Sequence, residues 1–348
     1  MPPPRKRRNG EPTDVVPSVQ VAALDALKTL TSSTERAGDE LTAPEILQNL
    51  VASLRHENRR VIISGTCALQ SLAAKKASHA AAIVDSGALV PLRALLESFD
   101  VEVKESAVRA MTALADAGEG PKEALLDDAT LEALVVNMNA GDSSIALRTA
   151  IARFFDVCSG YGAGSAARVM DSGATASVAA LARDAASTHA AGGASPKSRA
   201  VAFACLAQMA RHGDHLAAAV VDAGAVPDAL AALIDAEHAG VREAAAAMAR
   251  EIASKTPELA EAVAADGGVA ALVQNLRLER GEQRAILSTQ TLGFIADFRP
   301  SFAAAAVGVD QGRCLVEAME CAADGDASIA AAWAMVGSRL PEPGPVCP

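Results

Sequence analysis

Two short segments have residue types and a spacing that could do chemistry. His212, Asp214 and His215 place two imidazoles and a carboxylate within four residues, a donor set that binds zinc when another part of the chain adds a ligand. The glycine-rich run 160–164 has the composition of a phosphate-binding loop, but such a loop needs a preceding strand, and none is predicted. The chain also contains no Gly-Lys-Ser/Thr or Gly-x-Ser-x-Gly motif. We interpret the first segment as a helix junction and predict no enzyme, metal or cofactor.

The composition favours helices and excludes several classes of function. The 348 residues are 51% hydrophobic but only 3% aromatic, a mixture rich in alanine that suits closely packed helices. The net charge of −11 argues against nucleic-acid binding. The best apolar run, 302–309, is too short to span a membrane, and six scattered cysteines suit reduced thiols. We expect a soluble cytosolic protein that binds neither nucleic acid nor membrane.

The chain repeats a short unit. The sequence AVVDAGAVP at 219–227 recurs as AIVDSGALVP at 82–91 and RVMDSGA at 168–174, with weaker copies at 125–129, 263–269 and 309–312. The glycine position of the unit falls at residues 87, 129, 173, 224, 267 and 312, so the intervals are 42, 44, 51, 43 and 45 residues. The long interval contains a stretch of small and polar residues that predicts an inserted loop at 185–197.

Each period contains three predicted helices, which in the fourth repeat are 216–222, 226–234 and 241–253. A period near 42 residues made of three helices is typical of armadillo repeats. We therefore predict an all-α fold, an armadillo-repeat right-handed superhelical solenoid. Glycine lets the backbone turn sharply between the first two helices of a repeat, and the predicted structural turns are Gly87, Gly173, Gly224, Gly267 and Gly312.

The predicted organisation has four parts. Residues 1–14 form a disordered basic and proline-rich tail, 15–54 an N-terminal helical cap or partial repeat, 55–338 the armadillo repeats, and 339–348 a C-terminal tail. Ser/Thr-x-x-Glu-like signals with an early proline predict helix starts at 42–45 and 256–258. Because the array ends soon after Trp333, we expect its C-terminal edge to dock onto another chain or another copy.

The third helices are the predicted partner-binding elements. In nuclear import receptors of this fold they carry a Trp and, four residues later, an Asn, and this chain lacks that ladder, so importin-like binding is disfavoured. Ala152, Ala204 and Ala247 stand at the Trp position; they either form a groove for a partner helix or pack against neighbouring repeats. The candidate protein-binding residues on this face are Ser71, Arg109, Asp156, Gln208, Glu251, Gln290 and Trp333.

A basic tail precedes this acidic body. It consists of Arg5, Lys6, Arg7 and Arg8, in a first decapeptide without acids. Three interpretations are open: a nuclear localisation signal, an electrostatic contact with the acidic surface of tubulin, and a solvated tail. Its attraction to an acidic partner would weaken with salt.

Several segments resemble one armadillo family more closely. The sequences at 250–260 and 266–270, together with 220–227, 292–296 and 330–335, are similar to the axonemal central-pair armadillo family known as sperm-associated antigen six. The resemblance spans roughly residues 60–340, and the basic tail and early end suggest a shorter paralogue. It implies a non-enzymatic scaffold of the cytoplasm and of the axoneme of cilia and flagella, whose partners are other central-apparatus proteins. Contact with the microtubule is then indirect or through the basic tail. The alternative is a general cytosolic armadillo adaptor in trafficking or signalling.

Overall fold

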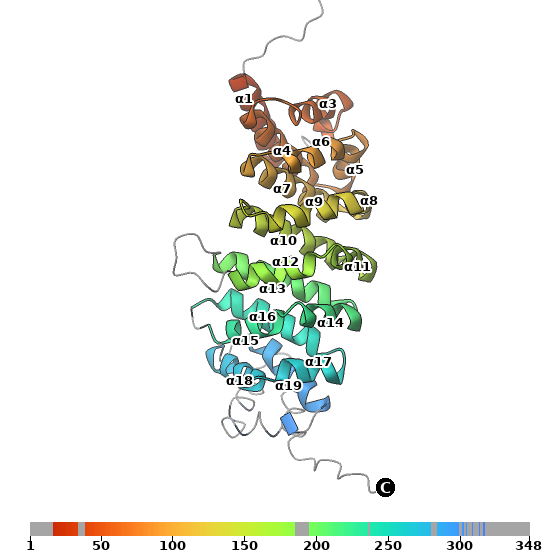
Figure 1. Cartoon of the computed structure of the whole chain (residues 1–348). Coiled ribbons are helices and arrows are strands. Elements are labelled where there is room, and N and C mark those ends of the chain that lie inside the picture. The colour runs from red at the N-terminus through yellow and green to blue at the C-terminus, as the bar shows by residue number, and fades with distance from the viewer. Residues whose placement is uncertain are drawn as a thin grey trace, which may run out of the picture. The chain divides into compact units, whose positions relative to one another are not determined.

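The computed structural model describes residues 17–33, 39–184, 195–235, 237–279 and 284–298, and separate positions between 301 and 316. All regular elements in this part of the chain are helices (Figure 1). Internal contacts divide the chain into two compact units, Met1–Pro121 and Lys122–Pro348. The division falls within the short helix α8 (Glu119–Leu125).

The first unit packs its helices around α4. Here α4 contacts both α1 and α7 extensively, and α3 and α5 lie against it. Leu69, Leu72 and Ala73 of α4 are fully buried in this layer. The elements are α1 (Pro17–Ser33), α3 (Pro44–Ser53), α4 (Arg59–Ala73), α5 (Ala77–Asp85), α6 (Leu89–Ala94), the 3-10 turn η1 (Leu95–Glu97) and α7 (Val101–Ala117).

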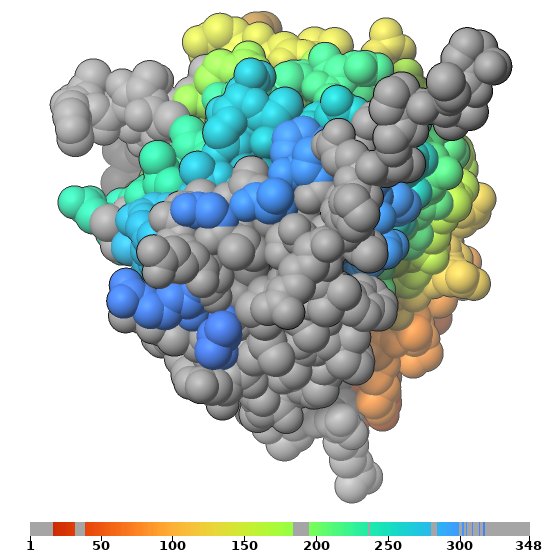
Figure 2. Space-filling model, turned by 90° about the horizontal axis from the view of Figure 1, so that it is seen from below, coloured from red at the N-terminus to blue at the C-terminus, as the bar shows by residue number. Residues whose placement is uncertain are grey.

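The second unit repeats three helices along its length. The elements are α9 (Asp128–Asn139), α10 (Ile145–Gly160), α11 (Ala163–Asp171), α12 (Ala174–Asp184), α13 (Pro196–Arg211), α14 (Asp214–Asp222), α15 (Ala225–Leu233), α16 (Ala239–Ala253), α17 (Pro257–Ala264), α18 (Gly268–Leu278) and α19 (Ala285–Phe298). The third helices α10, α13, α16 and α19 follow one another in contact, and α11, α14 and α17 form a second column beside them (Figure 1). The surface seen from the C-terminal side includes α18 and the described positions after α19 (Figure 2).

The predicted helices of the fourth repeat are confirmed as α14, α15 and α16, with starts within two residues and ends within one. They pack closely because small side chains occupy their interfaces. Ala202 of α13 and Ala245 and Ala246 of α16 are almost completely buried, so the third helices approach one another along alanine surfaces.

Sharp turns separate the first and second helices of a repeat. Gly87 and Gly224 have φ values of +80° and +74°, a left-handed conformation that side chains with a Cβ rarely adopt. The axes on either side of them bend by 81° and 83°. Gly173 and Gly267 share this conformation, with φ of +83° and +88°, and Gly312 lies outside the described residues.

No single described helix is both long and apolar enough to cross a membrane; the bent pairs around Gly87 and Gly224 reach that length and composition only when their two helices are taken together.

Both predicted helix starts are confirmed, since α3 begins at Pro44 and α17 at Pro257. The expected cap at Thr42 is wrong, because the N-cap position of α3 is Ala43, which makes no side-chain cap. Thr42 lies one residue too early, and its hydroxyl donates to the Asp39 carbonyl at 2.7 Å. Thr256 does cap α17, because its Oγ1 accepts from the Leu259 amide at 3.3 Å.

The predicted loop 185–197 is two residues too long at its end. Helix α13 already begins at Pro196, after the N-cap Ser195, whose side chain accepts from the Ser198 amide. Proline at the first helical position needs no amide partner and has a suitable φ. The segments 185–194, 1–14 and 339–348 lie outside the described residues.

Candidate protein-binding groove

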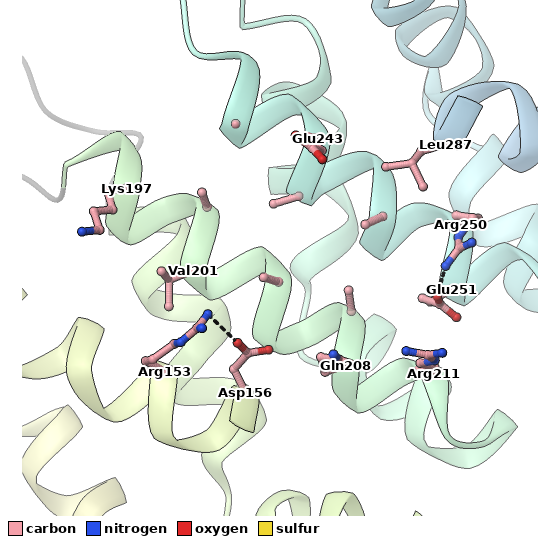
Figure 3. Close-up of a pocket in the computed structure, with 16 residues that line it drawn as sticks. Arg153, Asp156, Lys197, Val201, Gln208, Arg211, Glu243, Arg250, Glu251 and Leu287 are labelled. Atoms are coloured by element: carbon pink, nitrogen blue, oxygen red, sulfur yellow. Dashed lines mark hydrogen bonds and ion pairs between the residues drawn. The ribbon is translucent and has the colours of Figure 1, made fainter. Parts of the chain in front are cut away.

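A groove of about 560 Å³ runs over the third helices of the second unit. Side chains of α10, α13 and α16 line it, and Leu287 of α19 closes one border (Figure 3). This volume lies within the range of about 300–1,000 Å³ that is typical of ligand sites. The groove therefore lies on the face that the sequence assigns to partner binding.

The floor of the groove is made of small residues at helical spacing. Ala200 and Ala204 come from α13, and Gly240, Ala244 and Ala247 come from α16. Residues three or four positions apart share one face of a helix. Because these side chains are so short, the backbone of a bound segment can approach both helices closely.

Charged and polar side chains surround this floor, and two ion pairs are internal to the groove. Arg153 Nη1 lies 3.1 Å from Asp156 Oδ2 on α10. Arg250 pairs with its neighbour Glu251 and donates weakly to Gln290 Oε1 at 3.4 Å. These contacts neutralise both carboxylates within the groove.

Three further charges have no such partner. Within the described part of the chain, the side chains of Lys197, Arg211 and Glu243 form no hydrogen bond or ion pair, and all three are exposed. Lys197 and Glu243 come from the N-terminal parts of their helices, whereas Arg211 is the last residue of α13. In Figure 3 Arg211 lies beside Gln208, Arg250 and Glu251.

The Arg211 end of the groove is electropositive. Lys255 Nζ donates to the Arg211 carbonyl at 2.6 Å, which brings a second cation to this point. Burial lowers the pKa of the adjacent His212, and the Arg211 and Lys255 cations lower it further, whereas a Ser159 backbone hydrogen bond and Glu251 raise it. Burial is the largest of these causes, and the cations add to it because neighbouring positive charge disfavours an imidazolium.

The structure places three predicted site residues together. Asp156, Gln208 and Glu251 all line the groove, and Gln290 reaches it through its contact with Arg250. Ala204 and Ala247 form part of the floor, whereas Ala152 is completely buried and only packs between helices.

The other predicted residues are elsewhere. Ser71 and Arg109 belong to the first unit, where Ser71 Oγ donates to the Cys67 carbonyl at 3.0 Å and Arg109 pairs with Glu105 on its own helix. Trp333 and the tail residues Arg5, Lys6, Arg7 and Arg8 lie outside the described part of the chain.

Sequence reasoning missed most of the charged rim. The missed residues are Arg153, Lys197, Arg211, Glu243 and Arg250. A usable signal was present, because Lys197, Arg211 and Arg250 stand seven, seven and three positions from Ala204 or Ala247. Such spacings return to the same helix face, so extending each predicted position by one or two turns would have found them.

The two segments considered for chemistry occupy helix junctions. His212 caps the C-terminus of α13, and Asp214 opens α14 with His215 as its second residue. Among the described residues, no group of three or more His, Cys, Asp or Glu side chains is placed to hold a metal ion. The run 160–164 covers the end of α10 and the start of α11, with no strand before it.

Comparison with protein-family models and with curated proteins gave no match. Solved structures do match, among them an engineered protein with a TM-score of 0.80 and 25% identity, which covers 94% of this chain and 76% of its own. A structure of computationally designed armadillo repeat proteins for modular peptide recognition matches with a TM-score of 0.63 and 21% identity over 71% of this chain and 99% of that one. The fold is an armadillo-repeat solenoid.

A further armadillo structure has a ligand. It is a designed armadillo repeat protein in complex with the peptide (KR)4, with a TM-score of 0.59 and 21% identity over 68% of this chain and 98% of its own. These armadillo neighbours confirm the predicted fold class. They do not connect the chain with the axonemal central-pair family.

Proposed function

We propose that this armadillo-repeat protein is a non-enzymatic scaffold that binds a segment of a partner protein in the groove of α10, α13 and α16. The observation that carries the proposal is the groove itself, which has a volume of about 560 Å³, an alanine floor, and rim charges that are exposed and form no ion pair with any described residue. Apolar floors with a few placed polar groups are what recognition sites for peptides and helices have in common.

The neighbouring structures support the peptide-binding part of this proposal. One was designed for modular peptide recognition, and another is in complex with a basic peptide. An importin-like mode is not what we propose, because Ala204 and Ala247 stand where stacking tryptophans would be needed.

We further propose that the scaffold belongs to the central apparatus of the ciliary and flagellar axoneme. The support is the resemblance of segments 250–260 and 266–270 to the axonemal central-pair armadillo family. The partners would be other central-apparatus proteins, with microtubule contact indirect or through Arg5–Arg8. An acidic body is repelled by acidic tubulin at long range.

Localisation tests the axonemal part. The tagged chain, expressed in a ciliated cell, should remain along the axoneme, resist mild salt extraction, and be lost from axonemes without a central pair. A diffuse or nuclear signal with none in the axoneme would overturn it and favour the cytosolic adaptor in trafficking or signalling.

Substitution at the floor tests the groove. Ala204→Leu with Ala247→Leu fills the space over the alanine floor of α13 and α16 without adding a charge or an aromatic stacking surface, so capture of a partner recovered with the wild-type chain should be strongly reduced. Ala231→Leu is the matched control, because Ala231 is an exposed alanine of α15 outside the groove. Unchanged capture by the double variant, with a native circular dichroism spectrum, would rule the groove out.

A further inference from the structure

The groove differs in charge from the chain that forms it. The whole chain has a net charge of −11, but the groove is lined by four cationic side chains (Arg153, Lys197, Arg211 and Arg250) and three anionic ones (Asp156, Glu243 and Glu251). The lining therefore has one more positive charge than negative charges, although the chain as a whole is acidic. A locally positive site attracts anionic ligands.

The internal ion pairs decide which of these charges face a ligand. Asp156 is held by Arg153, and Glu251 is held by Arg250, so neither carboxylate is free to attract a basic side chain. Lys197 and Glu243 oppose each other in sign near the N-terminal parts of α13 and α16. Among the described residues, the groove charge that is left without an ion-pair partner is Arg211, and Lys255 donates a hydrogen bond to the Arg211 carbonyl.

The neighbourhood of Arg211 suits a carboxylate. A guanidinium donates two parallel hydrogen bonds to a carboxylate, which gives direction as well as attraction. Gln208 lines the same end one helical turn earlier, and its amide can donate a further hydrogen bond. Figure 3 shows both side chains at one end of the alanine floor, so a segment lying on that floor would reach them.

We propose that the groove selects an acidic peptide segment, with an Asp or Glu side chain of the partner held by Arg211 and Gln208 and small or apolar residues lying on the alanine floor. This inference rests on the proposed peptide-binding function and specifies its ligand. The designed neighbour, by contrast, is in complex with a basic peptide, (KR)4.

Selection from a random library of 12-residue peptides, displayed on phage with their C-termini fused to the coat, tests both statements. The full-length chain is the bait, and the Ala204→Leu/Ala247→Leu variant, whose floor is filled without a new charge or aromatic ring, is the counter-selection. We expect the enriched, groove-dependent peptides to be acidic. Because the displayed C-termini are blocked, enrichment reports side-chain carboxylates.

The outcomes separate the two proposals. Groove-dependent peptides that are neutral or basic would overturn the acidic preference and leave the peptide-binding function intact. Absence of any groove-dependent peptide would overturn both. Enriched acidic peptides that bind the double variant equally well would place recognition outside the groove and also overturn both.

Charge reversal then tests the role of Arg211. Fluorescence anisotropy with the best acidic peptide should show about a tenfold or larger loss of affinity for Arg211→Glu, together with a loss of affinity as salt increases. Arg168→Glu changes the net charge equally but lies on α11, paired with Glu123 and away from the groove, so its effect should stay below about twofold. If both variants lost the same amount of affinity, the effect would come from the overall charge of the protein, and the assignment of Arg211 would be overturned.

Discussion

Helices α13 and α16 use arginine in two opposite ways. Arg242, near the start of α16, is buried: its Nη2 lies 2.6 Å from Glu279 Oε1, and its Nη1 donates to the Asp235 carbonyl at 2.6 Å. Arg284 completes the cluster at 2.9 Å from Glu279 Oε2. Arg211, at the end of α13, is exposed and makes no ion pair within the described residues.

The difference separates residues that hold the repeats together from residues available to a partner. The buried position recurs with the repeat, since Arg199 stands one period before Arg242 and reaches the Asp228 carbonyl and the Asp235 carboxylate. Buried charges are costly unless paired and hydrogen-bonded, so these arginines stabilise the junctions between helices. An exposed charge without a partner contributes little to folding and keeps its full capacity to bind.

The strongest test of this comparison replaces each arginine by methionine. Arg242→Met leaves Glu279, whose side chain is 2% exposed, with one partner fewer and should lower the free energy of unfolding by about 3 kcal/mol or more. Arg211→Met should change it by less than about 0.5 kcal/mol. Urea denaturation followed by circular dichroism measures both, and similar values for the two variants would break the comparison.

A second test uses a buried amide in the same junction. Asn275 Nδ2 donates to the Leu233 carbonyl at 3.0 Å, and its Oδ1 accepts from Ser288 at 2.8 Å. Asn275→Ala leaves both partners without this hydrogen bond and should lower the free energy of unfolding, measured by urea denaturation, by about 1 to 3 kcal/mol. The exposed neighbour Gln274→Ala is the control, with an expected change within about 0.5 kcal/mol. A neutral Asn275→Ala would show that the junction does not depend on its polar contacts.

A third test concerns the backbone of the turn between α14 and α15, which sets the angle between these two helices. Gly224→Ala puts a Cβ at φ +74° and within 3.4 Å of Arg183 Nη2, so it should lower the thermal midpoint and cost about 1 to 2 kcal/mol. Gly164→Ala lies inside α11 with open space around it and should be neutral or stabilising by about 0.4 to 1 kcal/mol. Equal effects would mean that the left-handed turn carries no strain for alanine.

The smallest expected effect is a change in the pKa of His212, which depends on the positive charge of Arg211. Because the pKa of folded His212 is lowered, the unfolded chain takes up the proton more readily, and the stability contributed by neutral His212 is lost as the pH falls below the ordinary histidine range. Arg211→Gln should move the pKa of His212 upward in an NMR titration, toward its ordinary value. Lys197→Gln, at the other end of α13, should leave it unchanged; an equal shift in both would contradict a local field.

Local patterns predicted the repeats well. The helices of the fourth repeat follow from the spacing of their apolar residues, and the turns follow from glycine, which adopts the left-handed conformation easily. Both signals involve only residues close together in the sequence. The predicted cap at Thr42 failed because α3 begins one residue later than that cap requires, with Ala43 at the N-cap position, and a local pattern does not fix a helix boundary to a single residue.

The groove was only partly predictable. Ala152, Ala204 and Ala247 occupy equivalent places in their helices, yet Ala152 is buried and the other two are open to the groove. The repeat register assigns the same face to all three, and the packing of neighbouring repeats decides how much of that face is covered.

Residue patterns are sufficient to predict the helical class, the repeat period, the turns and the face that carries Asp156, Gln208 and Glu251. Which charges are neutralised depends instead on how the repeats pack. Arg242 and Arg211 are the same residue type on similar third helices, but Arg242 forms an ion pair with Glu279 from the next repeat, and Arg211 forms no ion pair with any described residue. Ion pairing depends on distances between residues roughly forty positions apart, and those distances are set when the repeats stack.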